Sequence, residues 1–88
     1  MLEPVYTNQF KKDVKKIKRR KKDTEKLKEL MQELGKNKGL PPEYQDHKLS
    51  GEWRGRRECH IEADWLLIYK IKGRLIIFER TGSHSDLF

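Results

Sequence analysis

The scarce apolar side chains of this chain fall into periodic blocks, and this pattern constrains the fold more than any other feature. Only 34% of the 88 residues are hydrophobic, whereas 40% are charged. Between residues 8 and 35 the apolar side chains recur every three or four positions, which indicates amphipathic helices. Between residues 54 and 80 they alternate or run together, which indicates strands. This segregation predicts a compact fold rather than a disordered polar chain.

The first half predicts one strand followed by a helical hairpin. Residues 3–7 resemble a short strand, and a helix begins near Thr7 or Asn8, either of which can cap free backbone N–H groups. Asp23 or Thr24 can cap a second helix in the same way. The apolar stripes are Phe10, Val14 and Ile17 in the first helix and Leu27, Leu30, Met31 and Leu34 in the second. Both helices need a sheet on which to bury these stripes.

The second half supplies that sheet. The predicted strands are residues 54–62, 65–72 and 74–80. Lys72 and Gly73 resemble a tight hairpin turn between the last two strands, and residues 81–88 are predicted to be a polar tail. The expected order is β-α-α-β-β-β, with an N-terminal strand and an α-helical hairpin packed on a small antiparallel sheet. We therefore predict a single α+β domain over residues 1–88.

The positive charge is concentrated in one segment. The formal net charge is +7, and residues 1–22 alone hold nine basic and two acidic side chains, so that nine minus two accounts for all of it. The basic residues are Lys11, Lys12, Lys15, Lys16, Lys18, Arg19, Arg20, Lys21 and Lys22. Such a field suits a phosphate backbone, an anionic membrane or an acidic protein partner.

The remaining composition predicts a soluble cytoplasmic protein. Cys59 is the one cysteine, so no intramolecular disulfide can form. The longest apolar run, residues 65–69, is too short to span a bilayer, and the N-terminus lacks the apolar core of a signal peptide.

The side chains suited to acid–base chemistry gather in the C-terminal half. They are His47, His60, His84, Asp46, Glu58, Asp64 and Arg80, with Trp53 and Trp65 among them. Imidazole titrates near neutrality, so paired histidines can deliver and remove protons at physiological pH. RNA carries its own nucleophile, the 2′-hydroxyl, and its cleavage needs a base, an acid and a cation for the phosphate. Two histidines and an arginine meet these needs without a metal or cofactor, while Trp65 and Phe88 can stack on bases.

Structural explanations exist for the same residues taken singly. Trp65 can belong to the core, and Asp64 can mark the turn that enters a strand. Arg80 can pair with Glu58 or Glu79, and the lysine-rich segment can be a solvated helix face. No CxxC, HxxxH or HExxH spacing occurs, which argues against a zinc site. Composition and spacing alone predict a basic α+β module, for which nucleic-acid binding is one hypothesis.

Three runs of residues carry a family resemblance. They are residues 44–53 with Asp-His-x-Leu-x-Gly-x-Trp, residues 57–69 with Cys-His-Ile-x-x-Asp-Trp, and residues 78–88 with Arg-Thr-Gly-Ser-His-x-x-Leu-Phe. Together they resemble the YafQ branch of the RelE/ParE toxin superfamily. The resemblance extends over essentially the whole chain, although the first 40 residues match by architecture more than by motif.

The resemblance implies the toxin of a bacterial toxin–antitoxin pair, an endoribonuclease that enters the ribosomal A site and cuts messenger RNA without a metal ion. It implies an acidic antitoxin, the ribosome and messenger RNA as partners, and no membrane. The free toxin is expected to be a monomer, and its complex with the antitoxin a heterotetramer. The matching functional positions are His47, His60, Asp64, Trp65, Arg80, His84 and Phe88, with Glu58 as a secondary substrate-binding candidate.

The implied mechanism divides the work among a few side chains. Either His60, held by Asp64, or His47 removes the proton of the 2′-hydroxyl. Arg80 stabilises the charge that builds on the phosphate. His84 protonates the leaving oxygen. The basic hairpin binds ribosomal RNA and orients the toxin.

Two other functions remain open. One is a ParE-like inhibitor of DNA gyrase, and the other is a non-catalytic module that binds nucleic acid through the basic hairpin. The three histidines, Asp64 and Phe88 favour the nuclease, because gyrase inhibition does not require an acid–base constellation.

Overall fold

The computed structural model describes residues 1–88 and contains a five-stranded sheet of order β1-β5-β4-β3-β2. The strand β1 runs parallel to β5, and the other neighbours are antiparallel. The elements are β1 (Glu3–Tyr6), α1 (Asn8–Arg19), α2 (Thr24–Gly35), the 3₁₀ turn η1 (Pro42–Tyr44), β2 (His47–Lys48), the 3₁₀ turn η2 (Gly51–Trp53), β3 (Arg57–Glu62), β4 (Trp65–Lys72), β5 (Leu75–Gly82) and α3 (His84–Leu87). The predicted α+β fold is confirmed, but the sheet is mixed rather than antiparallel as predicted, because β1 joins β5 in the parallel direction.

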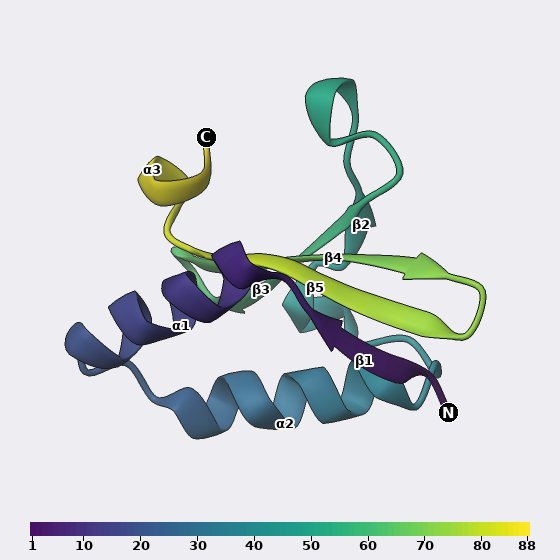
Figure 1. Cartoon of the computed structure of the whole chain (residues 1–88), viewed down its shortest axis with the longest axis horizontal. Helices are drawn as coiled ribbons and strands as arrows, with labels where there is room; N and C mark the ends of the chain where they lie inside the picture. The colour runs from purple at the N-terminus through teal and green to yellow at the C-terminus, as the bar shows by residue number, and fades with distance from the viewer.

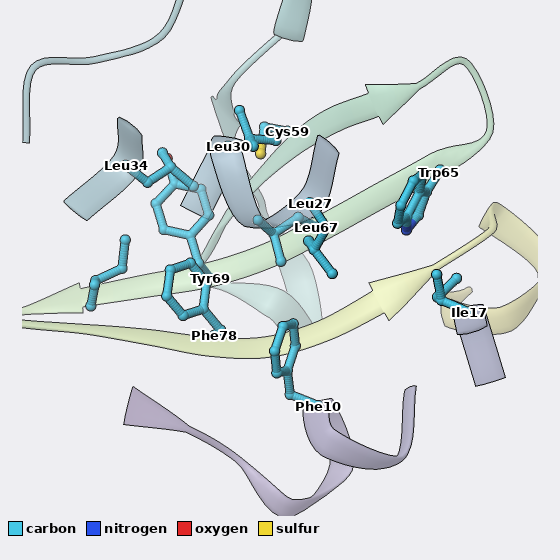
Figure 2. Packing of buried hydrophobic residues seen from close by; sticks show 11 residues of the cluster. Phe10, Ile17, Leu27, Leu30, Leu34, Cys59, Trp65, Leu67, Tyr69 and Phe78 are labelled. Atoms are coloured by element: carbon cyan, nitrogen blue, oxygen red, sulfur yellow. The ribbon is translucent and has the colours of Figure 1, made fainter. Parts of the chain in front are cut away.

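The helical hairpin forms for the reasons that the pattern predicts. The Thr7 hydroxyl accepts a hydrogen bond from the Phe10 backbone N–H at 3.0 Å, and Asp23 accepts one from the Glu25 N–H at 3.1 Å. The buried residues of the two helices include Phe10, Ile17, Leu27, Leu30 and Leu34. Figure 2 shows these side chains packed with Leu67, Tyr69 and Phe78 of the sheet. None of the helices is long and apolar enough to cross a membrane.

The strand β4 divides the molecule into two apolar layers. Its side chains at Trp65, Leu67 and Tyr69 belong to the main core beneath α1 and α2. Its alternate side chains, Leu66 and Ile68, form a smaller cluster on the other face. In Figure 1, α1 and α2 cover one face of the sheet, whereas α3 and the segment with η2 rise from the other. The sheet face away from the hairpin is therefore flanked by the short elements α3 and η2.

The C-terminal segment corrects one prediction. The sequence predicts a polar tail over residues 81–88, but β5 continues through Gly82 and α3 follows at once. Ser83 caps this short helix, and Leu87 is only 7% exposed because it packs on Leu66 and Ile68. The apolar side chain near the end of the segment therefore anchors it to the sheet.

Candidate functional site

A row of polar side chains crosses the sheet face that lies away from the helical hairpin. Strand register places His47 opposite Glu58. The same row continues across β4, because Glu58 lies opposite Ile68 and Ile68 lies opposite Arg80. His60 lies two residues beyond Glu58 on β3 and therefore points to the same face. The pleat of the sheet thus gathers residues from three strands in one place.

The three histidines are neighbours on this surface, and His60 is the common neighbour of the other two. The ring of His60 is centred 6.5 Å from that of His47 and 5.9 Å from that of His84. His47 comes from β2, His60 from β3 and His84 from α3. Side chains spread over 38 positions of the sequence, from 47 to 84, therefore share a single surface.

His84 is oriented by Asp64, which differs from the predicted pairing of Asp64 with His60. The His84 Nδ1 lies 2.6 Å from the Asp64 Oδ1, and the His84 backbone N–H donates to the same oxygen at 2.9 Å. These hydrogen bonds, the backbone one first, hold the pKa of Asp64 below its usual range. The carboxylate holds a proton on Nδ1 and leaves Nε2 free to exchange one. The prediction failed because the β3–β4 turn directs Asp64 toward α3.

His47 has an acceptor at each ring nitrogen. Its Nδ1 lies 2.6 Å from the Gln45 carbonyl oxygen, and its Nε2 lies 3.0 Å from the Glu58 Oε2. The Glu58 side chain is only 8% exposed, and its other oxygen has no hydrogen-bond partner. The ring of His60, by contrast, makes no hydrogen bond to the protein. Of the two histidines predicted as bases, His60 is the one with unengaged nitrogens.

Arg80 is held by an aspartate that the sequence motifs do not include. Its Nε donates to Asp13 Oδ2 at 2.8 Å and its Nη2 to Asp13 Oδ1 at 3.3 Å. The Asp13 side chain is 7% exposed and also accepts from the Thr81 backbone N–H at 3.2 Å. The alternative pairing of Arg80 with Glu58 or Glu79 is wrong, because Glu79 is bound by another arginine of the chain. Nη1 of Arg80 is left without a protein partner.

Burial excludes Trp65 from the predicted stacking on bases. The residue is 1% exposed, and its Nε1 donates to the Thr81 hydroxyl at 3.0 Å inside the core. Phe88 is 59% exposed and meets Trp53 edge to face, with the ring centroids 5.8 Å apart. An aromatic surface beside the histidines is therefore built from Phe88 and Trp53.

A second network that the sequence did not reveal anchors His47. The Tyr69 hydroxyl donates to Asp46 at 2.7 Å, and the Arg57 Nε donates to Asp46 at 3.1 Å. Burial, with the hydrogen bond to Asp46, raises the pKa of Tyr69. Since Asp46 directly precedes the two-residue strand β2, this network fixes the backbone that carries His47. Only the fold brings these three positions together.

The basic segment of the hairpin divides into paired and unpaired cations. Lys16 and Arg20 contact Asp86, while Lys22 and the later Lys26 contact Glu62. The basic residues of the segment that have no acidic partner in the chain are Lys11, Lys12, Lys15, Lys18, Arg19 and Lys21. These six are the cations that an external polyanion can reach without competition.

No set of three histidine, cysteine, aspartate or glutamate side chains is grouped closely enough to hold a metal ion. Cys59 is wholly buried, and burial raises the pKa of its thiol. It therefore serves as a small core residue rather than as a nucleophile or ligand.

Comparison with known proteins gives a consistent result along the whole chain. A family model described as the YafQ toxin of bacterial type II toxin–antitoxin systems matches residues 2–88. The mRNA interferase toxin YafQ of Escherichia coli K12 is 51% identical over 84 residues, which cover 94% of this chain and 91% of that protein. A chain in the crystal structure of the E. coli DinJ–YafQ toxin–antitoxin complex is 48% identical, with a TM-score of 0.91 and coverage of 99% and 97%. A metal-bound toxin from Helicobacter pylori is 37% identical, with a TM-score of 0.93 and full coverage of both chains.

The contact between His84 and Asp64 predicts the proton position on the imidazole. In wild type at about pH 8, where an ordinary imidazole is neutral, ¹H–¹⁵N spectra should show His84 protonated on Nδ1. Asp64→Asn removes the charge that holds this proton, so the His84 signals should move toward the Nε2–H form. His60, whose ring has no protein partner, is the internal control. Identical His84 signals in both proteins would contradict the assigned hydrogen bond.

Proposed function

This chain belongs to the YafQ family of bacterial type II toxins, and on that premise we propose that it is an endoribonuclease that cuts messenger RNA. The observation that carries the proposal is the group of three neighbouring histidine rings on the sheet face to which strand register also assigns Arg80, whose Nη1 has no protein partner. Cleavage through the 2′-hydroxyl needs groups that accept a proton, donate a proton and neutralise the phosphate. These side chains are candidates for all three roles.

The ring nitrogens support a division of roles between the histidines. His60 has both nitrogens free of the protein, so it is the group that takes the proton from the 2′-hydroxyl. His84 keeps Nδ1 on Asp64 and therefore presents Nε2, from which the leaving 5′-oxygen receives a proton. His47 can act as the base only after its contact with Glu58 breaks, so we assign it to binding and orientation.

Arg80 and the exposed aromatic residues complete the proposed site. Asp13 occupies Nε and Nη2 of Arg80, which aims Nη1 and leaves it available for a phosphate oxygen. A fixed guanidinium stabilises charge that develops in the transition state better than a mobile one. Phe88 and Trp53 provide rings on which an unpaired base can stack.

The acid role of His84 leads to a test in cells and in vitro. His84→Ala should lower cleavage of ribosome-bound messenger at least ~100-fold, a typical loss for one acid–base group. Ser85→Ala, on the exposed neighbouring position of α3, is the matched control and should cut normally. The 5′ ends of cellular messengers are mapped after induction of each protein. Growth arrest by wild type and His84→Ala alike, with no new 5′ ends, would instead favour gyrase inhibition.

The proposed chemistry needs no metal ion, since the histidines and Arg80 supply every required charge and proton. Toxin stripped of transition metals with a chelator, then returned to chelator-free buffer, should cut ribosome-bound messenger at the untreated rate. Added copper or zinc should not raise that rate. A loss of cleavage on stripping that either metal restores would contradict a metal-independent reaction.

We further propose that the ribosome presents the substrate, which places the toxin in the cytoplasm, and that the unpaired cations of α1 contact ribosomal RNA. An exposed cation near a phosphate displaces condensed counterions, and this makes binding sensitive to salt. The cognate partner is expected to be an antitoxin, by analogy with the E. coli complex, and the net charge of +7 favours an acidic one. The free toxin is expected to be a monomer, and its antitoxin complex a heterotetramer.

Neutralising the unpaired cations should weaken ribosome binding. The variant Lys11→Gln, Lys12→Gln, Lys15→Gln should bind less tightly at low salt, and the slope of log affinity against log salt should fall by about 0.7–0.9 for each phosphate that the toxin no longer neutralises. Cleavage at saturating ribosome should persist. Lys36→Gln, directly after α2 and paired with Glu33, is the control. An unchanged slope would show that α1 does not contact RNA.

A further inference from the structure

The helix α3 is too short to hold itself in place. It has four residues, and isolated helices of that length do not form in water because nucleation is costly. It nevertheless carries His84, whose Nε2 must face the substrate within a fraction of an ångström for efficient proton transfer. Something outside α3 must therefore fix its orientation.

Besides Asp64, which contacts His84 itself, the basic segment at the C-terminal end of α1 contacts α3. Arg20 donates to the carboxylate of Asp86 through two nitrogens, from Nη1 to Oδ2 at 2.6 Å and from Nη2 to Oδ1 at 2.9 Å. Lys16 adds a third contact to Oδ1 at 3.2 Å. Forked pairing of this kind fixes orientation as well as distance. It joins residues that are 66 and 70 positions apart in the sequence.

The same carboxylate also closes the turn that leads into α3. The Ser83 backbone N–H donates to Asp86 Oδ2 at 2.8 Å, and the Ser83 hydroxyl accepts from the Asp86 N–H at 3.2 Å. A Cβ atom at Gly82 would come within 2.9 Å of the Asp86 Cβ, so the chain folds back tightly here. Asp86 thus links α1, the end of β5 and the catalytic candidate two residues before it.

We propose that Arg20 and Lys16, acting through Asp86, position His84 for proton transfer and do not serve chiefly as RNA contacts. This inference rests on the proposed acid role of His84. It divides the basic segment by function: the unpaired cations bind RNA, whereas these two belong to the machinery that aligns the acid. The Asp86 side chain is only 13% exposed, so it is a built partner rather than a chance surface contact.

The test compares two adjacent arginines. Arg20→Gln should lower the single-turnover cleavage rate at saturating ribosome about 10- to 100-fold, the range expected for a displaced catalytic group. Ribosome affinity should change little. Arg19→Gln, which removes a cation with no acidic partner, should lower ribosome affinity and the salt slope. Lys36→Gln, which lies outside both the site and the basic segment, is the control that should leave the saturated rate unchanged. Asp86→Asn keeps an acceptor for Ser83 and should match Arg20→Gln.

A conservative variant separates the charge of Arg20 from its forked geometry. Arg20→Lys keeps a cation opposite Asp86 and leaves the Ser83 cap intact, so it should retain more of the saturated rate than Arg20→Gln. In Arg20→Gln the imidazole signals of His84 should shift, while those of His47 stay in place. Equal saturated rates for Arg20→Gln and wild type, with a lower salt slope, would overturn the proposal and make Arg20 an RNA contact.

The two proposals fail in different ways. If wild type does not cut messenger, the nuclease function fails, yet the His84 signals of Arg20→Gln still report whether the ion pair orients the ring. If wild type cuts and neither the rate nor the signals respond to Arg20→Gln, the positioning role alone is wrong.

Discussion

The burial of β4 on both faces is the constraint on which the rest of the structure depends. Residues 65–69 are at most 1% exposed, because helices cover one side of the strand and α3 with its neighbours covers the other. The part of a strand that is buried on both faces is expected to be mostly apolar, so residues 65–69 supply no acid–base group to the site. The polar side chains of the site instead stand on β2, β3 and β5. The buried strand sets the spacing between them.

The sequence predicted the features that depend on contacts between residues close together in the chain, and missed those that depend on distant residues. The helical stripes and the β4–β5 hairpin follow from periodicity, which is local. The structure confirms both, with the turn at Gly73 and Arg74 rather than at Lys72 and Gly73. The strand β2 and the helix α3 escaped prediction because they have two and four residues and exist only through distant partners. The prediction that Trp65 contacts substrate is wrong because a strand buried on both faces shows no alternation that would mark an inward side chain. The pairing of Asp64 with His84 rather than His60 depends on a turn whose direction no motif encodes.

Aspartates, rather than the histidines themselves, tie the candidate site together. Asp13 holds Arg80, Asp64 and Asp86 hold the helix that carries His84, and Asp46 holds the strand that carries the first histidine. Each carboxylate binds a group from a different part of the chain, in a protein in which 40% of the residues are charged. The helix α1 contributes to two of these links, with a negative side chain (Asp13) in one and a positive side chain (Lys16) in the other. Its surplus of lysine and arginine is therefore only partly a surface for a polyanion.

The burial of Cys59 has a practical consequence. Its side chain has no exposed surface and lies on β3 between Glu58 and His60, and the chain contains no other thiol. A thiol reagent can react only when β3 opens, so the labelling rate under native conditions measures the opening free energy of the strand at the centre of the site. The thiol of Cys59 is thus an intrinsic reporter. Binding of an antitoxin or ribosome that stabilises β3 would slow its modification, and no engineered label is needed. The same burial shields the toxin from oxidants that inactivate exposed thiols.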